Sequence, residues 1–296
     1  MTIKRALVLS GGGSKGAYQV GALKALTEAG RQWNTVHGVS VGALNGGWLA
    51  MHKPEEQASS IEGLYKIWEG VKTSANIYKP WAPWKLNYIW SLWKGSLNSG
   101  APMRKLVEGI WDAKKITSSG VRFTVGCVSL TSGLYQTIPS DNDNIMEYVL
   151  ASSHLPVVFE PLTVDGEQWV DGGIRHQIPI LEALKERPDE IDVIITSPVA
   201  IERTLPIDPL TSLPKVALRA SEILADQVYA NDFFMVFKAI KHDNVKINLF
   251  VPSIQPNQDS MDFDQAIIQQ AILLGYEETK KKLAEMAAEP TSSNAQ

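Results

Sequence analysis

The chain has 296 residues, of which 44% are hydrophobic and 20% charged, with a formal net charge of −4. This composition is ordinary for a globular protein with a sizeable core, and the mild negative charge argues against nucleic acid as a partner. The single cysteine, Cys127, excludes an internal disulfide and is interpreted as a small core residue in a reducing compartment. The apolar run after Lys4 and Arg5 is too short for a secretory signal, and no run reaches the ~18 residues of a membrane span. We therefore expect a cytoplasmic protein.

The N-terminal part of the chain predicts the beginning of a parallel α/β sheet. A buried strand over 5–9 leads into a glycine loop, and helical spacing follows over 17–26. A second strand over 35–39 leads straight into Ser40, and a helix begins behind it at Ala43. The order strand, helix, strand, helix is typical of parallel strands with helices packed on the sheet.

Residues 74–98 break this rhythm, after a charged helical segment from about Glu55 to Lys72. Tryptophans gather in the segment with tyrosines and prolines but without a clear period: Trp81, Trp84, Trp90 and Trp93. One interpretation is an irregular excursion anchored by buried aromatic rings. The other is a lid or interfacial patch, which would bring the protein transiently to a membrane surface.

The rest of the chain continues the alternating pattern. We expect helices over 101–112, 144–152, 179–186, 214–241 and 263–287, strands over 121–129, 134–138, 191–196 and 246–251, and an extended connector over 156–161. A hairpin over 163–170 turns at Asp165 and delivers Asp171 at its far end. No repeat or linker divides the chain, so we expect one domain over 1–288, followed by a disordered tail over 289–296.

Ser40 lies in Gly38-Val39-Ser40-Val41-Gly42, between a strand and a helix. This arrangement is typical of a nucleophile elbow, a sharp turn that exposes the serine hydroxyl. The turn crowds neighbouring backbone against any Cβ, which explains glycine at both Gly38 and Gly42. The N-terminus of the following helix also favours negative charge that develops near the hydroxyl. The alternative for so short a motif is an ordinary solvent-exposed serine turn.

The segment Gly11-Gly12-Gly13-Ser14-Lys15-Gly16 admits three interpretations. It fits a dinucleotide fingerprint, but no carboxylate ends the second strand to hold a ribose. A phosphate-binding loop would need Gly-Lys-Ser/Thr in that order. We favour an oxyanion hole, built from amides of the consecutive glycines, because the first two strands should be neighbours and bring this loop beside the elbow. Lys15 then either meets an anionic head group or stays solvated at the start of the helix.

The sequence offers two candidates for the general base, His242 and Asp171. His242 alone lies far enough downstream for the order Ser, Asp, His of an α/β-hydrolase triad, but its surroundings look like a solvated helix end. His37 precedes the elbow within a strand and should point away from the hydroxyl. Asp171 leaves a strand into Gly172-Gly173, where the missing side chains let another group come close. The alternative is an aspartate that only caps its own turn.

Several segments together resemble the patatin-like phospholipase family. They are residues 11–18, the elbow around Ser40, Asp171-Gly172-Gly173, and the stretches 151–156 and 274–277. The similarity runs roughly from Arg5 into the last helix, whereas the Trp-rich stretch matches no pattern.

The resemblance implies a three-layer α/β/α fold with a mostly parallel sheet. It also implies a hydrolase of carboxylic ester bonds in phospholipids or related acyl lipids, with a Ser–Asp dyad and neither metal nor cofactor. By position, Ser40 is the nucleophile, Asp171 is the base, and the amides of Gly12 and Gly13, with Gly11 before them, form the oxyanion hole. The rival interpretations are a Ser-Asp-His esterase and a non-catalytic acyl-lipid-binding protein, and a nucleotide-binding loop is more distant.

Overall fold

The structure is a computed structural model that describes residues 3–198, 212–242 and 245–288. Within these residues the strands of the central sheet follow the order β11-β10-β1-β2-β5-β9-β8, and β6 also pairs with β5. The parallel strands are β1 (Arg5–Leu9), β2 (Thr35–Val39), β5 (Arg122–Ser129), β10 (Glu190–Ile194) and β11 (Lys246–Phe250). The strands with antiparallel pairing are β6 (Tyr135–Pro139), β8 (Leu162–Val164) and β9 (Glu167–Asp171). The predicted mostly parallel α/β sheet is confirmed.

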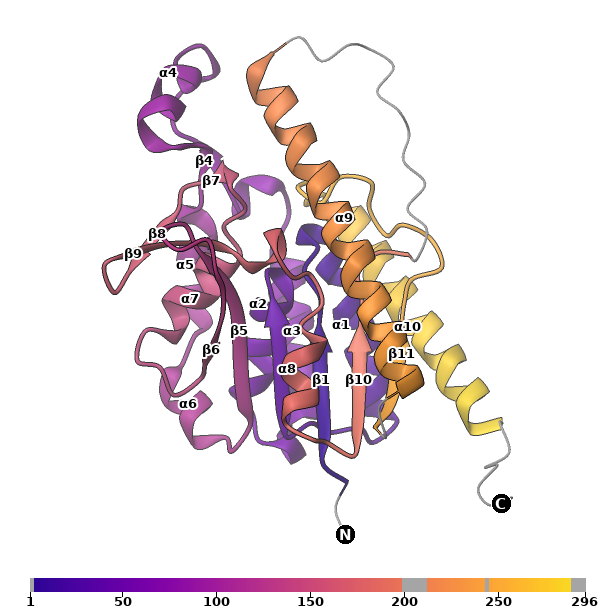
Figure 1. The fold of residues 1–296 in the computed structure, drawn as a ribbon. Helices are drawn as coiled ribbons and strands as arrows, with labels where there is room; N and C mark the ends of the chain where they lie inside the picture. Colours follow the sequence, from indigo (N-terminus) through magenta and orange to yellow (C-terminus); the bar gives the residue numbers. More distant parts are fainter. Residues whose placement is uncertain (1–2, 199–211, 243–244, 289–296) are drawn as a thin grey trace.

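Helices cover both faces of this sheet (Figure 1). One face carries α1 (Ala17–Glu28), α2 (Val41–Ala50), α3 (Gln57–Gly70), α5 (Ala101–Ile110), α7 (Ile145–Ser152) and α10 (Gln265–Ala288), with α6 (Ala113–Ser118) beside α2. The other face carries α8 (Ile180–Lys185) and α9 (Leu213–His242). In β1, Leu7 and Leu9 face the first layer, whereas Ala6 and Val8 face the second, as the two-residue period of a strand requires. The result is the expected three-layer α/β/α arrangement.

The register of the sheet brings three segments that are distant in sequence to the carboxyl ends of the parallel strands. Because β1 and β2 are parallel neighbours, the glycine loop after β1 and Ser40 after β2 leave the sheet side by side. On the other side of β2, Val39 pairs with Gly126 of β5, and the next residue of β5, Cys127, pairs with Asp171 of β9. The carboxyl ends of parallel strands are where α/β folds bind ligands.

The structure corrects the expectation of an irregular excursion over 74–98. This stretch contains β3 (Lys79–Pro80), the eleven-residue helix α4 (Trp84–Lys94) and β4 (Ser96–Ser99). The connector over 156–161 contains β7 (Val157–Phe159), which pairs in parallel with β4 in a small second sheet. Gly95 ends α4 in a left-handed conformation with φ 71°. Figure 1 shows α4 projecting from the end of the molecule above the small sheet.

The other predicted helices and strands lie within a few residues of their expected limits. Cys127 is buried in the core as predicted. Within the described ranges, no helix is both long enough and apolar enough to cross a bilayer. The predicted tail over 289–296 lies outside the described residues, and the one-domain organisation remains a prediction.

Candidate active site

Ser40 occupies a strained backbone turn. Its φ of 56° and ψ of −130° fall in a region that side chains other than glycine rarely adopt. A Cβ on Gly38 would lie 2.4 Å from the carbonyl oxygen of Gly42, and one on Gly42 would lie 2.3 Å from that of Leu9. Neither flanking position has room for a side chain, which is the crowding that a nucleophile elbow requires.

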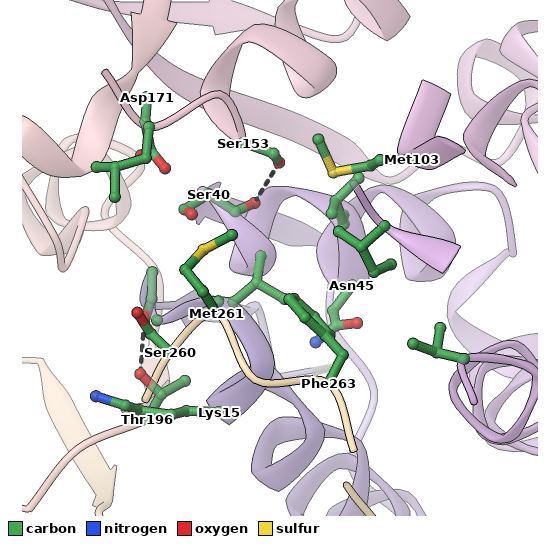
Figure 2. Close-up of a pocket in the computed structure, with 18 of the residues that line it drawn as sticks. Lys15, Ser40, Asn45, Met103, Ser153, Asp171, Thr196, Ser260, Met261 and Phe263 are labelled. Carbon is green, nitrogen blue, oxygen red and sulfur yellow. Dashed lines mark hydrogen bonds between the residues drawn. The ribbon is translucent and has the colours of Figure 1, made fainter. Parts of the chain in front are cut away.

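Two serines at the C-terminal end of α7 hold this turn in place: Ser152 is the last residue of the helix, and Ser153 follows it. The amide of Ser40 donates to Oγ of Ser152 at 2.8 Å, and that hydroxyl donates to the carbonyl oxygen of Gly126 at 2.7 Å. Oγ of Ser153 donates to the carbonyl oxygen of Ser40 at 3.3 Å (Figure 2). Sequence reasoning gave neither serine a role, although both lie in the stretch 151–156 that resembles the family.

The glycine loop folds so closely that its glycines cannot be replaced. Gly12 has a φ of 148°, and a Cβ there would lie 2.1 Å from Oγ1 of Thr196. Gly13 has a φ of 58°, and a Cβ there would lie 2.2 Å from the carbonyl oxygen of Ser260. These glycines leave bare backbone at the pocket, as Gly11 does.

The three amides of this loop differ in availability. The amide of Gly11 already donates to the carbonyl oxygen of Gln177 at 3.0 Å. This hydrogen bond removes Gly11 from the candidate donors of the oxyanion hole. In the part of the chain that the structure describes, no hydrogen bond is found from the amides of Gly12 and Gly13. These two donors are therefore the ones that a bound oxyanion can use.

The remaining loop residues support the turn. Oγ of Ser14 accepts from Nδ2 of Asn257 at 2.9 Å, which ties the loop to the segment before α10. A Cβ on Gly16 would lie 2.3 Å from the side chain of Val41, so this glycine lets α1 start against the elbow helix. Lys15 lines the pocket, and its Nζ donates to Oγ of Ser197 at 3.5 Å.

Asp171 is buried beside Ser40. Its residue is 4% exposed, and burial raises the pKa of its carboxyl from the ordinary 3.8 to about 7. The Gly173 amide, which donates to Oδ1 at 2.7 Å, and the nearby hydroxyl of Ser40 act in the opposite direction and lower the pKa. A Cβ on Gly172 would lie 2.3 Å from the carbonyl oxygen of Gly126, so this turn also needs glycine. A carboxyl that titrates near neutral pH is suited to general-base chemistry.

A cavity of about 220 Å³ connects this pair of side chains with the interior of the helical layer. Ser40 and Asp171 lie side by side at one wall, and apolar side chains surround the space (Figure 2). The apolar walls come mainly from α2, α3 and α5, with Leu64, Met103 and Val107 among them. Across the described residues, no group of three or more histidine, cysteine, aspartate or glutamate side chains is arranged to hold a metal.

The histidines considered as bases lie elsewhere. Nδ1 of His37 is 2.7 Å from Oγ1 of Thr124 inside the core, as expected for a structural histidine. His242 is the last residue of α9, and its side chain lies outside the described part. α9 is followed in the chain by β11, whose first residue, Lys246, pairs with Glu190 at the amino ends of the parallel strands. Ser40 lies at the carboxyl ends of these strands, at the opposite end of the sheet from that point.

Comparison with known proteins identifies the family. The sequence model described as patatin-like phospholipase matches residues 7–184. This chain belongs to the patatin-like phospholipase family. It is 27% identical to lysophospholipase NTE1 of Yarrowia lipolytica over 185 residues, and 27% identical to human patatin-like phospholipase domain-containing protein 6 over 176 residues. These matches cover 60% and 59% of this chain, but only 11% and 12% of the relatives' own length.

Solved structures show the same fold for this patatin-like chain. Human GIVD cytosolic phospholipase A2 aligns with a TM-score of 0.54 at 8% identity, over 97% of this chain and 60% of that one. The same enzyme in complex with a methyl gamma-linolenyl fluorophosphonate inhibitor aligns with a TM-score of 0.52 at 12% identity, over 97% and 59%. At such low identity the likeness concerns the fold alone.

We predict that kcat/KM for ester hydrolysis rises with pH, with an apparent pKa close to 7. Asp171 must be ionised to accept a proton from Ser40, and burial raises its pKa to about 7. The measurement is the initial rate on a neutral ester whose alcohol does not ionise between about pH 5 and pH 9. A rate that does not change across neutral pH would contradict this role.

Protein stability gives an independent check on the same titration. The folded carboxyl keeps its proton up to about pH 7, whereas the unfolded one loses it near 3.8. Folding therefore takes up a proton in this window, and the free energy of unfolding falls as the pH rises through it. Asp171→Asn removes the ionisable group, so the free energy of unfolding of this variant does not fall in that window. The Tm of the variant should therefore exceed that of the wild type by about 5 °C at about pH 8 and by less at about pH 5.

Proposed function

We propose that this chain is a serine lipid acyl hydrolase that cleaves carboxylic ester bonds of phospholipids or related acyl lipids. The observation that carries the proposal is the buried carboxyl of Asp171 beside the strained Ser40, facing a loop in which two backbone amides have no partner among the described residues. Family membership supports the same chemistry, because the relatives bear the names lysophospholipase and patatin-like phospholipase.

The proposed reaction passes through an acyl-enzyme. Asp171 accepts the hydroxyl proton as Oγ of Ser40 attacks the ester carbonyl carbon, and the amides of Gly12 and Gly13 hold the tetrahedral oxyanion. When the intermediate collapses, the C–O bond to the alcohol breaks, and the alcohol leaves with the proton from Asp171. Water then attacks the acyl-enzyme, Asp171 again takes the proton, and the fatty acid is released as Ser40 regains its hydrogen.

The apolar cavity supports a lipid acyl chain as the group that is transferred. Its walls include Leu64 of α3 and Val107 of α5, which are both buried, while the polar groups gather at Ser40 and the glycine loop. A long hydrocarbon chain gains about 0.8 kcal/mol for each methylene that it buries in such a space. The cytosolic phospholipase A2 of the same fold is known in complex with a methyl gamma-linolenyl fluorophosphonate inhibitor.

The exposed face of α4 supports contact with a membrane surface. Leu86, Ile89, Trp90 and Trp93 follow one face of the helix and are 52%, 58%, 49% and 85% exposed. A surface helix usually turns such a stripe towards the core, and an outward stripe with tryptophan suits the boundary between water and lipid. Trp81 does not share this face, because its Nε1 donates to Ser96 within the small sheet.

The four tryptophans named from the sequence therefore differ in their exposure and in their role in the proposal. Trp90 and Trp93 carry the proposal of membrane contact, Trp81 packs inwards, and the side chain of Trp84 lies outside the described part. The cytoplasmic location stays a prediction.

Substitution of the dyad tests the proposed chemistry. Ser40→Ala and Asp171→Asn should each lower kcat/KM on acyl esters on the order of 10³-fold or more, because each removes a group that the transition state needs. A serine-directed fluorophosphonate should label Ser40 in the wild type, as read by mass spectrometry of the peptide.

His242→Ala is the matched control for the rival triad and should leave hydrolysis nearly unchanged. A folded protein that takes up no label and hydrolyses none of a panel of acyl esters would favour an acyl-lipid-binding protein instead. A large loss in His242→Ala would favour the Ser-Asp-His esterase.

A substitution in the cavity wall tests where the acyl chain lies. Val107→Trp should fill the cavity, so kcat/KM for a long-chain ester should fall by about 10-fold or more, while an acetyl ester is hydrolysed much as before. Val107→Ala widens the same wall and should retain long-chain hydrolysis. Equal losses on long and short esters in Val107→Trp would show that the acyl chain does not use this cavity.

A charged substitution on α4 tests the membrane contact. Ile89→Glu with Trp93→Glu should weaken co-sedimentation with phosphatidylcholine vesicles by about 10-fold or more, since two large apolar side chains no longer bury in lipid. The wild type should also show a blue shift of tryptophan fluorescence with the vesicles. Leu273→Glu on α10 is the control, because Leu273 is 60% exposed but lies far along the chain from this stripe. Vesicle binding equal to that of the wild type would exclude α4 as the contact.

A further inference from the structure

We propose that Gln177 is a further substrate-contacting residue of this site, and that Asp232 on α9 is the positioning residue that holds it there. The inference rests on the proposed ester hydrolysis at Ser40. Gln177 lies in the loop after the Asp171-Gly172-Gly173 turn and lines the same cavity as the dyad.

The main chain of Gln177 links the two halves of the site. Its carbonyl oxygen accepts from the amide of Gly11 at 3.0 Å, and Gly11 begins the proposed oxyanion loop. In sequence it follows the loop in which Gly173 donates to the carboxylate of Asp171. A shift of this backbone would therefore move the oxyanion loop and the base loop together.

The side chain of Gln177 lies between the same two loops. The position of a Cβ on Gly11 is 2.4 Å from Oε1 of Gln177 and 3.2 Å from Cβ of Ser40. The position of a Cβ on Gly173 is 2.9 Å from Nε2 of Gln177 and 3.0 Å from Oδ1 of Asp171. The carboxamide thus comes close to both members of the dyad, and glycine at both positions makes room for it.

The carboxamide is available to a ligand. Within the residues that the structure describes, no hydrogen bond of the Gln177 side chain is found, although the side chain is half-buried and reaches the cavity. A primary amide offers two N–H donors and one acceptor, and leaving these unused in a closing site is unfavourable. Nε2 is the end of the amide that lies on the Asp171 side, where the alcohol leaves, so we infer that its N–H donates to the alcohol oxygen of a bound ester as the C–O bond breaks.

Asp232 of α9 fixes the backbone of Gln177 from the helical layer that contains α8 and α9. Its residue is 6% exposed, and Oδ2 accepts from the amides of Gln177 and Ile178, the latter at 3.1 Å. Oδ1 lies 3.1 Å from Nδ1 of His176, whose ring packs against Tyr135 at 4.8 Å between ring centroids. One carboxylate thus binds three successive residues of the loop, and hydrogen bonds to an ionised acceptor are the strong ones.

Two substitutions separate the side-chain role from the backbone role. Gln177→Met keeps the shape and the main-chain bonds but removes the amide, so kcat should fall about 10- to 100-fold, with KM changed by no more than about threefold. Asp232→Asn keeps the size of the side chain but removes its charge and one of its two acceptor oxygens, which weakens the hold on the loop, so kcat should fall about 10-fold. Because Asp232 acts through Gln177, the loss in the double variant should be clearly smaller than the product of the single losses.

Rates are expressed per Ser40 labelled by fluorophosphonate, so that unfolded protein does not contribute. Asn231→Ala, at the neighbouring exposed position of α9, should turn over like the wild type. Wild-type kcat in both Gln177→Met and Asp232→Asn, multiplicative losses, or an equal loss in Asn231→Ala would each overturn the inference. These outcomes leave the proposed function standing, which fails instead if Ser40→Ala hydrolyses esters at the wild-type rate.

Discussion

The removal of water from the carboxyl of Asp171 is the constraint on which the site depends. An aspartate in water binds a proton too weakly to draw one from a serine, with a pKa of about 3.9. Here β9 lies across β5, so that Asp171 pairs with Cys127 and is shielded by the core. Burial raises the pKa to about 7, while the Gly173 amide and the nearby hydroxyl of Ser40 keep the ionised form accessible. In the proposed reaction, desolvation thus supplies the basicity that an imidazole supplies in other serine hydrolases.

This constraint requires that two distant parts of the chain meet with little freedom. The glycine loop and Ser40, the proposed nucleophile, follow the first two strands, whereas Asp171 arrives after the hairpin of β8 and β9. Ser152 and Ser153 at the end of α7 bind the amide and the carbonyl oxygen of Ser40, and the carbonyl oxygen of Gln177 accepts from the Gly11 amide. A strained turn such as the one at Ser40 persists only where its surroundings determine it from several sides. The hydrogen bonds from α7 and from the loop after β9 supply that support, so the strain and the burial are maintained by the same contacts.

Local features of this site were readable from the sequence, and long-range ones were not. Gly38 and Gly42 predict the elbow because the clash that demands them arises within one turn. The buried strands were equally clear, since apolar runs bounded by glycines need no knowledge of partners. In contrast, α4 was missed because its apolar stripe faces outwards and merges in the sequence with the tryptophan-rich run that begins at Trp81. The use of the Gly11 amide by Gln177 leaves no trace in either residue type, so only the structure could remove Gly11 from the donors.

The placement of α4 relates the proposed membrane contact to the cavity. The helix runs directly into β4, where Asn98 pairs with Phe159 of β7, and Phe159 lines the cavity that holds Ser40. Tyr78, just before β3, packs edge-on against the same ring at 6.1 Å between centroids. An acyl chain that leaves a bilayer must stay out of water along its whole path, because each exposed methylene is unfavourable by about 0.8 kcal/mol. The small sheet and the aromatic contact connect the surface helix to the cavity wall. If α4 meets the membrane as proposed, the cavity lies behind the contact, which favours a substrate taken from an interface over one captured from solution.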